Sequence, residues 1–221
     1  MTPNKEDYLK RIYERSQAPG KMTNKEIAHL MGVSEPATSE MLKKMIQEDW
    51  IIKDKEKGYL VTEKGMVQVS NLYRKHRLIE VFLIQNLGYS SQEIHQEAEV
   101  LEHSVSDQFI NQLEILLDFP EHCPHGGRIP RMQELLQEDF TQQLSQVQPN
   151  KDYVLRRFPD QPDVIDYLEN QDFHLGTAFH LLRKDDFLQT LELQFPEKTL
   201  ILPLNLADQL YVETLAWVSI T

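Results

Sequence analysis

The order of local patterns in the first 62 residues constrains the fold more than any other feature of the sequence. A helical pattern over residues 4–17 precedes "TNKEIAHLMG" and "VSEPATSEMLKKMIQEDW", two short helical patterns separated only by a turn. "WIIKDKEKGYLV" then predicts two short strands, residues 50–53 and 58–61, around a charged turn. This order predicts a winged helix-turn-helix. The alternative interpretation is a small helical domain with a hairpin and no role in binding DNA.

Residues at the expected helix ends support this division. Thr23 and Glu26 have the spacing of a capping box, and Gly32 is placed to end the helix that they begin. Ser34 is a candidate N-cap for the next helix, and Pro36 falls in its first turn, where a missing N–H costs little. The two helices are therefore expected to be adjacent and short.

Charge divides the chain into two parts. The 221 residues carry a net charge of −12, yet residues 1–77 hold 15 Lys/Arg against 11 Asp/Glu. The acidic excess therefore lies entirely in residues 78–221. We expect the first part to bind a polyanion such as DNA and the remainder to attract cations.

The composition is typical of an ordinary globular protein, with 40% hydrophobic and 26% charged residues. No apolar run approaches the roughly 18 residues of a transmembrane helix, and the charged N-terminus lacks a signal-peptide core. The single cysteine excludes an intrachain disulfide framework. We therefore expect a cytoplasmic protein with no membrane partner.

Two long helices are expected in the middle of the chain, over residues 62–86 and 90–117. Ser90 and Glu93 form a capping box at the start of the second. Apolar residues run almost without interruption over residues 78–84, so the first helix would be buried nearly all round. We infer a symmetric homodimer that forms with or without a ligand.

The remainder of the chain changes character twice. "DFPEHCPHGGRIP" is rich in Pro and Gly and predicts a loop, while "RMQELLQEDFTQQLSQ" predicts a short polar helix. From Tyr153 onward, "YVLRRF", "LELQF" and "KTLILPL" predict strands, with a helix in "PDVIDYLENQ". The predicted fold class is therefore mainly α with a small β-rich C-terminal domain, for which a barrel is expected.

Several groups of metal-ligating residue types stand out. Glu99, Glu102 and His103 are offset by three and four positions, so one helical face would carry them. Either this is a solvated polar face or the three groups bind a cation. The other candidate donors are Asp7, the i, i+4 pair His76 and Glu80, and the loop residues Cys123 and His125.

The motifs "KEDYLKRIYE", "ATSEMLKKM", "YRKHRLIEVFL", "EAEVLEH" and "CPHGG" occur in this order. With them the chain resembles the diphtheria-toxin-repressor family of metal-dependent transcriptional repressors, and its manganese-responsive streptococcal-type branch in particular. The resemblance is strong over residues 1–130 and weaker over 150–217. It implies a homodimer that binds a palindromic operator with a divalent cation as corepressor, and metal-uptake genes are the expected targets.

The resemblance also implies three domains and two ions per subunit. The domains would be a winged helix-turn-helix (1–73), a helical metal-binding and dimerisation domain (74–148) and an SH3-like, FeoA-like β domain (149–221). One metal site would comprise Glu80, Cys123, His125 and Asp160, with Asp163 as a competitor for the last place. The second would comprise Asp7, Glu99, Glu102 and His103, with His76 as an additional ligand.

Donor chemistry indicates which ion these sites prefer. Several iron-responsive relatives carry Cys where this chain has Glu102 and Met where it has Asp7, and both departures point away from iron. An oxygen and nitrogen donor set suits a hard ion such as Mn2+, with Fe2+ as a further candidate. Cys123 softens the other site, so Zn2+ or Cd2+ could compete there.

The second helix of the motif would enter the major groove with small residues at its N-terminal end. Direct base reading should be modest, because bidentate Arg or Asn side chains are missing there. The DNA-binding candidates are Ser34, Glu35, Pro36, Ala37 and Ser39, together with the phosphate-binding candidates Lys43, Lys44, Lys53, Lys55 and Lys57.

Two other function classes compete with a metal-dependent repressor. Carboxylates with His could instead hold two cations in a dinuclear hydrolase. A winged-helix regulator that senses oxidation through Cys123 is the other alternative. We expect no enzyme and no small-molecule substrate, because a hydrolase would leave the winged helix without a role.

Overall fold

The computed structural model describes residues 4–16 and 20–215, so the end of the predicted first helix at residue 17 lies outside them. The chain divides into two compact units. We call residues 1–76 with 130–137 the winged unit, and residues 77–129 with 138–221 the helix–barrel unit. Within the described ranges, no helix is long and apolar enough to span a membrane.

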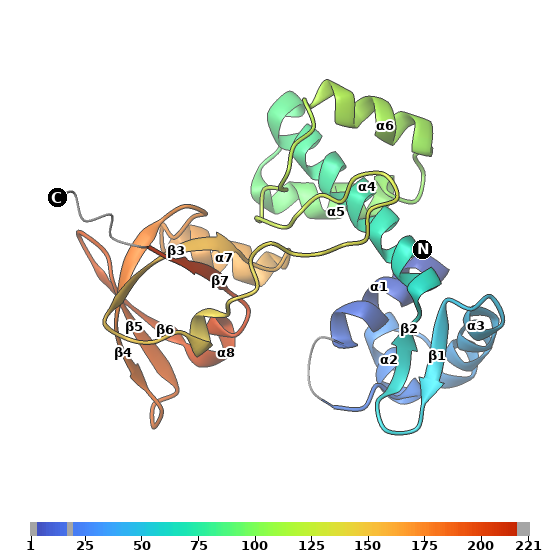
Figure 1. Cartoon of the computed structure of the whole chain (residues 1–221), viewed down its shortest axis with the longest axis horizontal. Helices are drawn as coiled ribbons and strands as arrows, with labels where there is room; N and C mark the ends of the chain where they lie inside the picture. The colour runs from blue at the N-terminus through green and yellow to red at the C-terminus, as the bar shows by residue number, and fades with distance from the viewer. Residues whose placement is uncertain (1–3, 17–19, 216–221) are drawn as a thin grey trace. The chain divides into compact units, whose positions relative to one another are not determined.

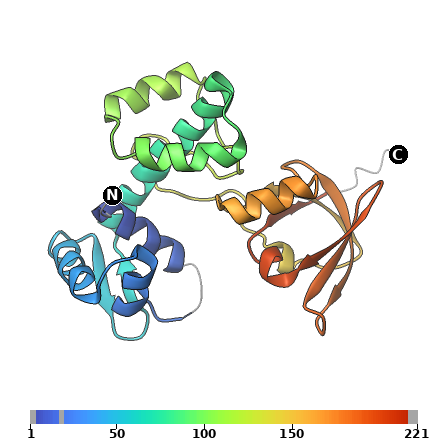
Figure 2. The same ribbon diagram turned by 180° about the vertical axis from the view of Figure 1, so that it is seen from behind.

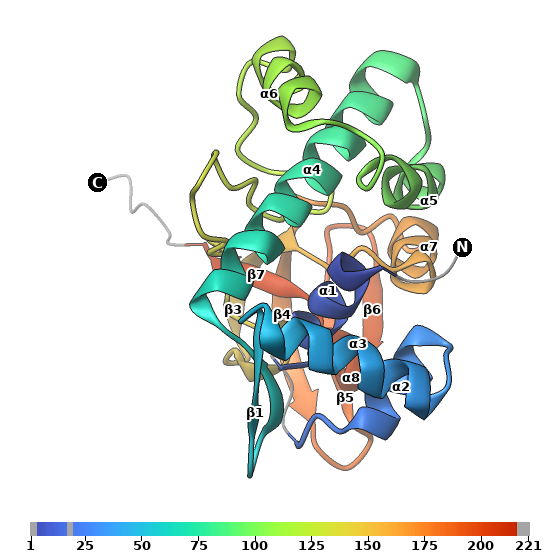
Figure 3. The same ribbon diagram turned by 90° about the vertical axis from the view of Figure 1, so that its right-hand side faces the viewer.

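The winged unit has the predicted helix-turn-helix and wing. Figure 3 shows the hairpin of β1 and β2 projecting as a wing beyond α2 and α3. An isolated bridge from Met22 to Gly58 attaches the segment before α2 to the wing. The elements are α1 (Lys5–Ser16), α2 (Asn24–Met31), α3 (Glu35–Gln47), β1 (Ile51–Asp54), β2 (Gly58–Val61) and the start of α4 (Glu63–Leu87).

Side chains cap these helices nearly as predicted. The Thr23 hydroxyl accepts the Glu26 backbone N–H at 3.2 Å, and Ser34 accepts the N–H of Ala37 at 3.4 Å. The Glu26 carboxylate is bound by Arg15 at 2.5 Å instead of closing a capping box. Gly32 ends α2 in the left-handed conformation. The sequence therefore fixes where α2 and α3 begin, which sets the direction of α3.

Helix α4 matches its prediction and continues from the winged unit into the helix–barrel unit. Its apolar run, however, is buried within its own unit: Leu78, Ile79, Val81 and Leu83 are all at most 3% exposed. The run therefore does not itself require a partner subunit, which corrects the argument drawn from it. Large apolar side chains that are exposed in this region lie elsewhere, at Leu87, Val100, Phe109, Ile115, Leu116 and Phe119.

The predicted single helix over residues 90–117 is wrong, because two helices occupy this range. Helix α5 covers Ser91–Leu101 and α6 covers Asp107–Leu116. The Ser90–Glu93 capping box is present as predicted. Ser106 starts a new helix by accepting the N–H of Phe109 at 3.1 Å, and serine at this place favours capping over continuing a helix.

The predicted helix over residues 131–146 is also wrong. The segment is irregular apart from the short 3-10 helix η1 (Leu144–Gln146), and Gln133 has a positive φ of 67°. Leu136 explains why: it is buried in the core of the winged unit, and its N–H donates to Ser70 Oγ at 2.7 Å. A polar helix with one exposed face would not place Leu136 there.

The C-terminal part of the helix–barrel unit is an SH3-like antiparallel sheet with strand order β6-β5-β4-β3-β7. The sheet curls around one apolar core, and α7 lies alongside it in Figures 1 and 2. Sequence patterns located β3, β5, β6 and α7 but not β4 or β7. The elements are β3 (Lys151–Arg157), α7 (Pro162–Asn170), β4 (Ala178–Asp185), β5 (Thr190–Gln194), β6 (Thr199–Pro203), α8 (Leu204–Ala207) and β7 (Tyr211–Thr214).

We expect Ser106→Ala to lower the free energy of unfolding by about 1 kcal/mol, because it removes the N-cap of a ten-residue helix. Ser104→Ala is the matched control, since the exposed Ser104 hydroxyl caps no helix and only donates to Val100 O at 3.2 Å. Urea unfolding followed by circular dichroism measures both. Equal losses for the two variants would contradict a helix boundary at Ser106.

Candidate metal centre

A tight hairpin over residues 122–128 brings Cys123 and His125 together. An antiparallel bridge joins His122 to Arg128, and the Cys123 N–H donates to Gly127 O at 2.9 Å. Gly126 lies against β3 so closely that an added Cβ would be 1.9 Å from the carbonyl oxygen of Arg156. Only glycine fits there, which explains the "HGG" run and the fixed position of His125.

This hairpin faces Glu80 of α4. Donor atoms of Glu80, Cys123 and His125 all lie within 4.8 Å of one another. His125 Nδ1 lies 3.4 Å from Glu80 Oε1, and the three residues are between 1% and 6% exposed. Ligand atoms about 2.0–2.6 Å from one cation lie at such separations, so these three can share an ion after small adjustments.

Two more residues of the helix–barrel unit adjoin this group. Asp160, in the loop after β3, has Oδ1 at 3.7 Å from His125 Nε2, and its Oδ2 contacts His95 Nδ1. Asp163 is exposed in the first turn of α7 and takes no part in the group. Donor atoms of Glu80, His95 and Asp160 also lie within 4.8 Å of one another.

His95 was missed by sequence reasoning. The available signal was its position four residues before Glu99 on the same helix, where the two side chains now meet at 3.3 Å. His76 lies one turn before Glu80 on α4, and its side chain is likewise buried. Helix geometry therefore puts the His76 ring on the Glu80 face of α4.

Protonation of the two histidines balances the buried carboxylates. Burial by itself lowers the pKa of His125, but hydrogen bonds to Cys123 and Glu80 outweigh it and raise the pKa from 6.5 to about 10. The pKa of His95 is raised to about 9 against the same effect of burial, by Asp160 and then Glu99. Both rings therefore carry a proton at neutral pH, which a bound cation would displace.

The second predicted group lies at the end of α5. Glu102 follows the last residue of the helix and is 2% exposed, while His103 Nε2 lies 3.2 Å from Glu102 Oε1. Glu99 is more exposed and contacts His95. Asp7 belongs to the winged unit, where its Oδ2 accepts the Asn4 backbone N–H at 2.7 Å. Its part in this site remains a prediction.

The chemistry of the first group fits a divalent cation. Carboxylate, imidazole and thiol donors converge from a helix and a rigid hairpin, and their burial disfavours leaving them charged without compensation. The set supplies oxygen, nitrogen and one sulfur, which suits Mn2+, Fe2+, Zn2+ or Cd2+ to different degrees.

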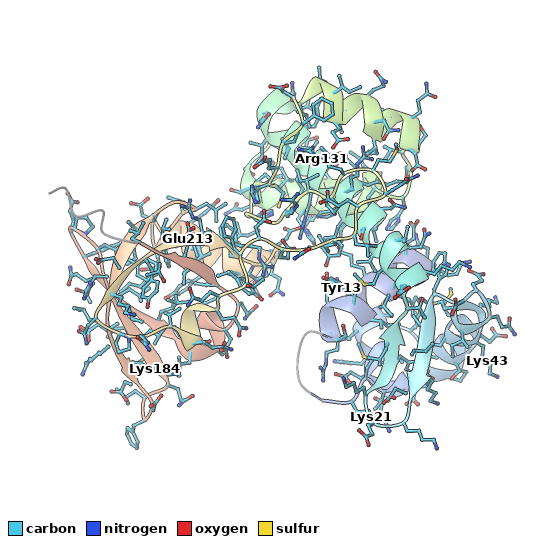
Figure 4. The ribbon with its side chains drawn as sticks, viewed as in Figure 1. Tyr13, Lys21, Lys43, Arg131, Lys184 and Glu213 are labelled. Atoms are coloured by element: carbon cyan, nitrogen blue, oxygen red, sulfur yellow. The ribbon has the colours of Figure 1, made fainter. Side chains whose placement is uncertain are left out.

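The predicted DNA-binding residues lie in two places, at α3 with its N-cap and on the wing formed by β1, β2 and their turn. All are exposed except the half-buried Ser39, whose hydroxyl donates to Asn24 Oδ1 at 3.3 Å. Lys21 lies beside the wing, where its Nζ donates to Lys55 O at 2.6 Å. Figure 4 shows Lys21 and Lys43 at the outer edge of the winged unit.

Comparisons with known proteins agree with this architecture. Family models match the N-terminal DNA-binding domain of the iron dependent repressor over residues 1–59 and its metal binding and dimerisation domain over residues 62–131. A FeoA domain model matches residues 142–214.

Solved structures similar to the whole chain are those of metal-dependent regulators. ScaR with bound Zn2+ is 50% identical, with 96% of this chain and 100% of that chain covered and a TM-score of 0.90. The metal-dependent transcriptional regulator MtsR is 53% identical over 97% of this chain and 100% of its own, with a TM-score of 0.85. The manganese regulator SloR is 46% identical over 97% of this chain and 100% of its own, with a TM-score of 0.88.

We expect Mn2+ affinity to rise by at least about tenfold per pH unit between pH 6 and pH 8, because His125, with its raised pKa of about 10, must lose a proton to become a ligand. The protons released are counted by calorimetry in buffers of different ionisation enthalpy. An affinity for Mn2+ that is independent of pH over this range would show that no proton is displaced from His125 and that His125 does not bind the ion.

Proposed function

The chain belongs to the iron-dependent repressor family of metal-dependent transcriptional repressors, and we propose that it is a manganese-responsive member with two cations per subunit. The observation that carries this proposal is the buried group of Glu80, Cys123 and His125, with Asp160 beside it, in the same chain as a winged helix-turn-helix. The cation acts as corepressor, and the DNA partner is a palindromic operator, of which metal-uptake genes are the expected targets.

Manganese is favoured by donor chemistry and by the relatives. ScaR is described as a manganese-activated repressor and SloR as a manganese regulator. Glu99, Glu102 and His103 offer oxygen and nitrogen only, which suits a hard, weakly bound ion. ScaR structures with Zn2+ and Cd2+ support competition by softer ions, and in this chain Cys123 is the residue that would favour them.

The first site would be held by Glu80, Cys123, His125 and Asp160, with His95 as a further ligand. His76 was assigned to the second site by the resemblance, but its position one turn before Glu80 on α4 favours the first site instead. The bound cation supplies positive charge that replaces the protons on the histidines. His125 stays in place because the Phe158 N–H donates to its carbonyl oxygen at 3.1 Å. Asp160 and the hairpin residues lie on separate segments of the helix–barrel unit, so this site mainly stabilises that unit.

The second site would be held by Asp7, Glu99, Glu102 and His103. Clustered carboxylates repel one another until a cation neutralises them. Because Asp7 belongs to the winged unit and the others to the helix–barrel unit, we propose that ligation by Asp7 fixes the DNA-binding helix in position. We therefore assign the switch to this site.

The winged unit would read DNA through the N-terminal end of α3, and the wing would bind phosphates. Pro36 and Ala37 present apolar surface suited to thymine methyl groups, whereas Lys53, Lys55 and Lys57 are exposed on the wing. Specificity rests partly on DNA shape, since the exposed end of α3 lacks bidentate readers. We further propose a homodimer in the cytoplasm, joined through the exposed apolar side chains of α5 and α6.

We expect DNA binding to require the cation and to fall by about 10³ or more when salt is raised fourfold, because several lysines per subunit contact phosphate. The probe is a duplex selected from a random library in the presence of Mn2+, tested by fluorescence anisotropy with Mn2+ or with a chelator. Equal affinity in both conditions would end the corepressor proposal, and a flat salt dependence would remove the lysines from the interface.

We expect Asp7→Ala and Glu102→Ala each to abolish metal-activated binding of that duplex, because each removes a ligand of the switching site. Cys123→Ser should weaken activation and lower the melting temperature measured in Mn2+, without erasing the response. Glu102→Cys should move the preference toward Zn2+ or Cd2+, because thiolate replaces a hard donor.

Glu6→Ala, on the residue next to Asp7, is the matched control for loss of one carboxylate from α1. Metal titrations of duplex binding measure all of these variants, and circular dichroism checks that they fold. Full metal activation in Asp7→Ala would refute the bridging role of Asp7.

A further inference from the structure

Arg77 of α4 holds both ends of one segment of the chain. Its guanidinium donates to the carbonyl oxygen of Arg128 and binds Glu138 Oε1 at 2.6 Å. Glu138 in turn accepts the Arg128 backbone N–H through Oε2 at 3.0 Å. The two side chains are only 9% and 15% exposed, so this ion pair lies largely out of solvent. A charged pair in that environment is costly to break.

The fit around this guanidinium is close. A Cβ on Gly127 would lie 2.6 Å from the Arg77 guanidinium carbon, so glycine there lets the hairpin approach the side chain. Burial would raise the pKa of Glu138, but Arg77 and Arg157 outweigh it and lower the pKa below the ordinary value. Arg77 therefore fixes the base of the hairpin that carries Cys123 and His125.

The segment between the two ends is built into the winged unit. Residues 130–137 belong to that unit by their contacts, whereas residues 129 and 138 belong to the helix–barrel unit. Leu136 is 7% exposed in the core that contains Tyr8, Leu9 and Met45. Its N–H donates to Ser70 Oγ, which itself donates to Met66 O at 2.7 Å. The core of the winged unit is thus incomplete without this segment.

We propose that Arg77 and Glu138 are positioning residues for metal activation, because they tie the metal-binding hairpin to the segment that completes the winged-unit core. Ligation of Cys123 and His125 would fix the hairpin. Because Arg77 binds both residue 128 and Glu138, the two ends of segment 130–137 would then be fixed as well, and with them the position of Leu136. The inference rests on the proposed function and deepens it. It adds a route by which the first site, otherwise stabilising, affects DNA binding.

The test compares Glu138→Gln and Arg77→Lys with the control Leu135→Ala, whose side chain is 50% exposed beside Leu136. Two measurements are made on the full chain. The first is the gain in affinity for the Mn2+-selected duplex when Mn2+ is added. The second is amide hydrogen exchange at residues 130–137 with and without Mn2+, which needs no DNA.

We expect Glu138→Gln to lower the Mn2+-dependent gain by about tenfold, while Mn2+ affinity of the DNA-free protein stays close to that of the unmodified chain. Mn2+ should slow exchange at Leu136 in the unmodified chain and in Leu135→Ala, but not in Glu138→Gln. Arg77→Lys keeps the charge but loses the two-armed contact, so it should also lower the Mn2+-dependent gain and abolish the slowing of exchange at Leu136. It serves as the test variant if Glu138→Gln does not fold.

A merely structural pair gives a different result. If the variants lower the melting temperature but keep the gain and the slowing of exchange, the positioning role is overturned. The same holds if Mn2+ does not slow exchange at Leu136 in the unmodified chain. Failure of that chain to bind the duplex with Mn2+ would overturn the proposed function instead, and the exchange measurement would still decide this inference.

Discussion

The burial of Glu80 is the constraint on which the functional part of the structure depends. A carboxylate 1% exposed on a long helix is stable only when positive charge lies against it. In the protein without metal, a proton on His125 supplies that charge. The pKa of His125 is raised because the same carboxylate stabilises the protonated ring. On the proposed function, a divalent cation would exchange for the proton without rearranging the core, because the hairpin is already held by Gly126 and by β3. The unit would then fold around a site that takes either a proton or a cation.

The two units use charge in opposite ways. The wing carries exposed lysines, whereas the helix–barrel unit keeps its acidic groups near histidines and arginines that compensate them. Buried ionic groups of this kind contribute little net stability but make the structure sensitive to which counter-charge is present. That sensitivity is what a metal-dependent repressor requires, since DNA affinity must follow the concentration of one ion.

Sequence patterns predicted the local structure correctly where a helix-capping residue or an alternation of apolar and polar residues was present. Thr23, Ser34 and Ser90 mark helix starts that are confirmed, and the wing strands lie within one residue of their predicted bounds. The break at Ser106 was missed because the apolar spacing continues through it. The contact of His95 with Asp160 and the ion pair of Arg77 with Glu138 could not be predicted, since the partners lie 65 and 61 residues apart in the chain. Leu136 was assigned to a polar helix because its burial depends on a core formed by distant residues.

The winged unit is discontinuous, and this has a consequence for synthesis on the ribosome. Its helices and wing are complete by residue 76, but the core awaits residues 130–137. Until these residues have left the exit tunnel, the pocket for Leu136 is open and apolar surface is accessible to chaperones. The DNA-binding part of the chain therefore cannot reach its final state before the hairpin with Cys123 and His125 has been made. A nascent chain interrupted before that hairpin would therefore lack the segment that completes the core of its DNA-binding unit.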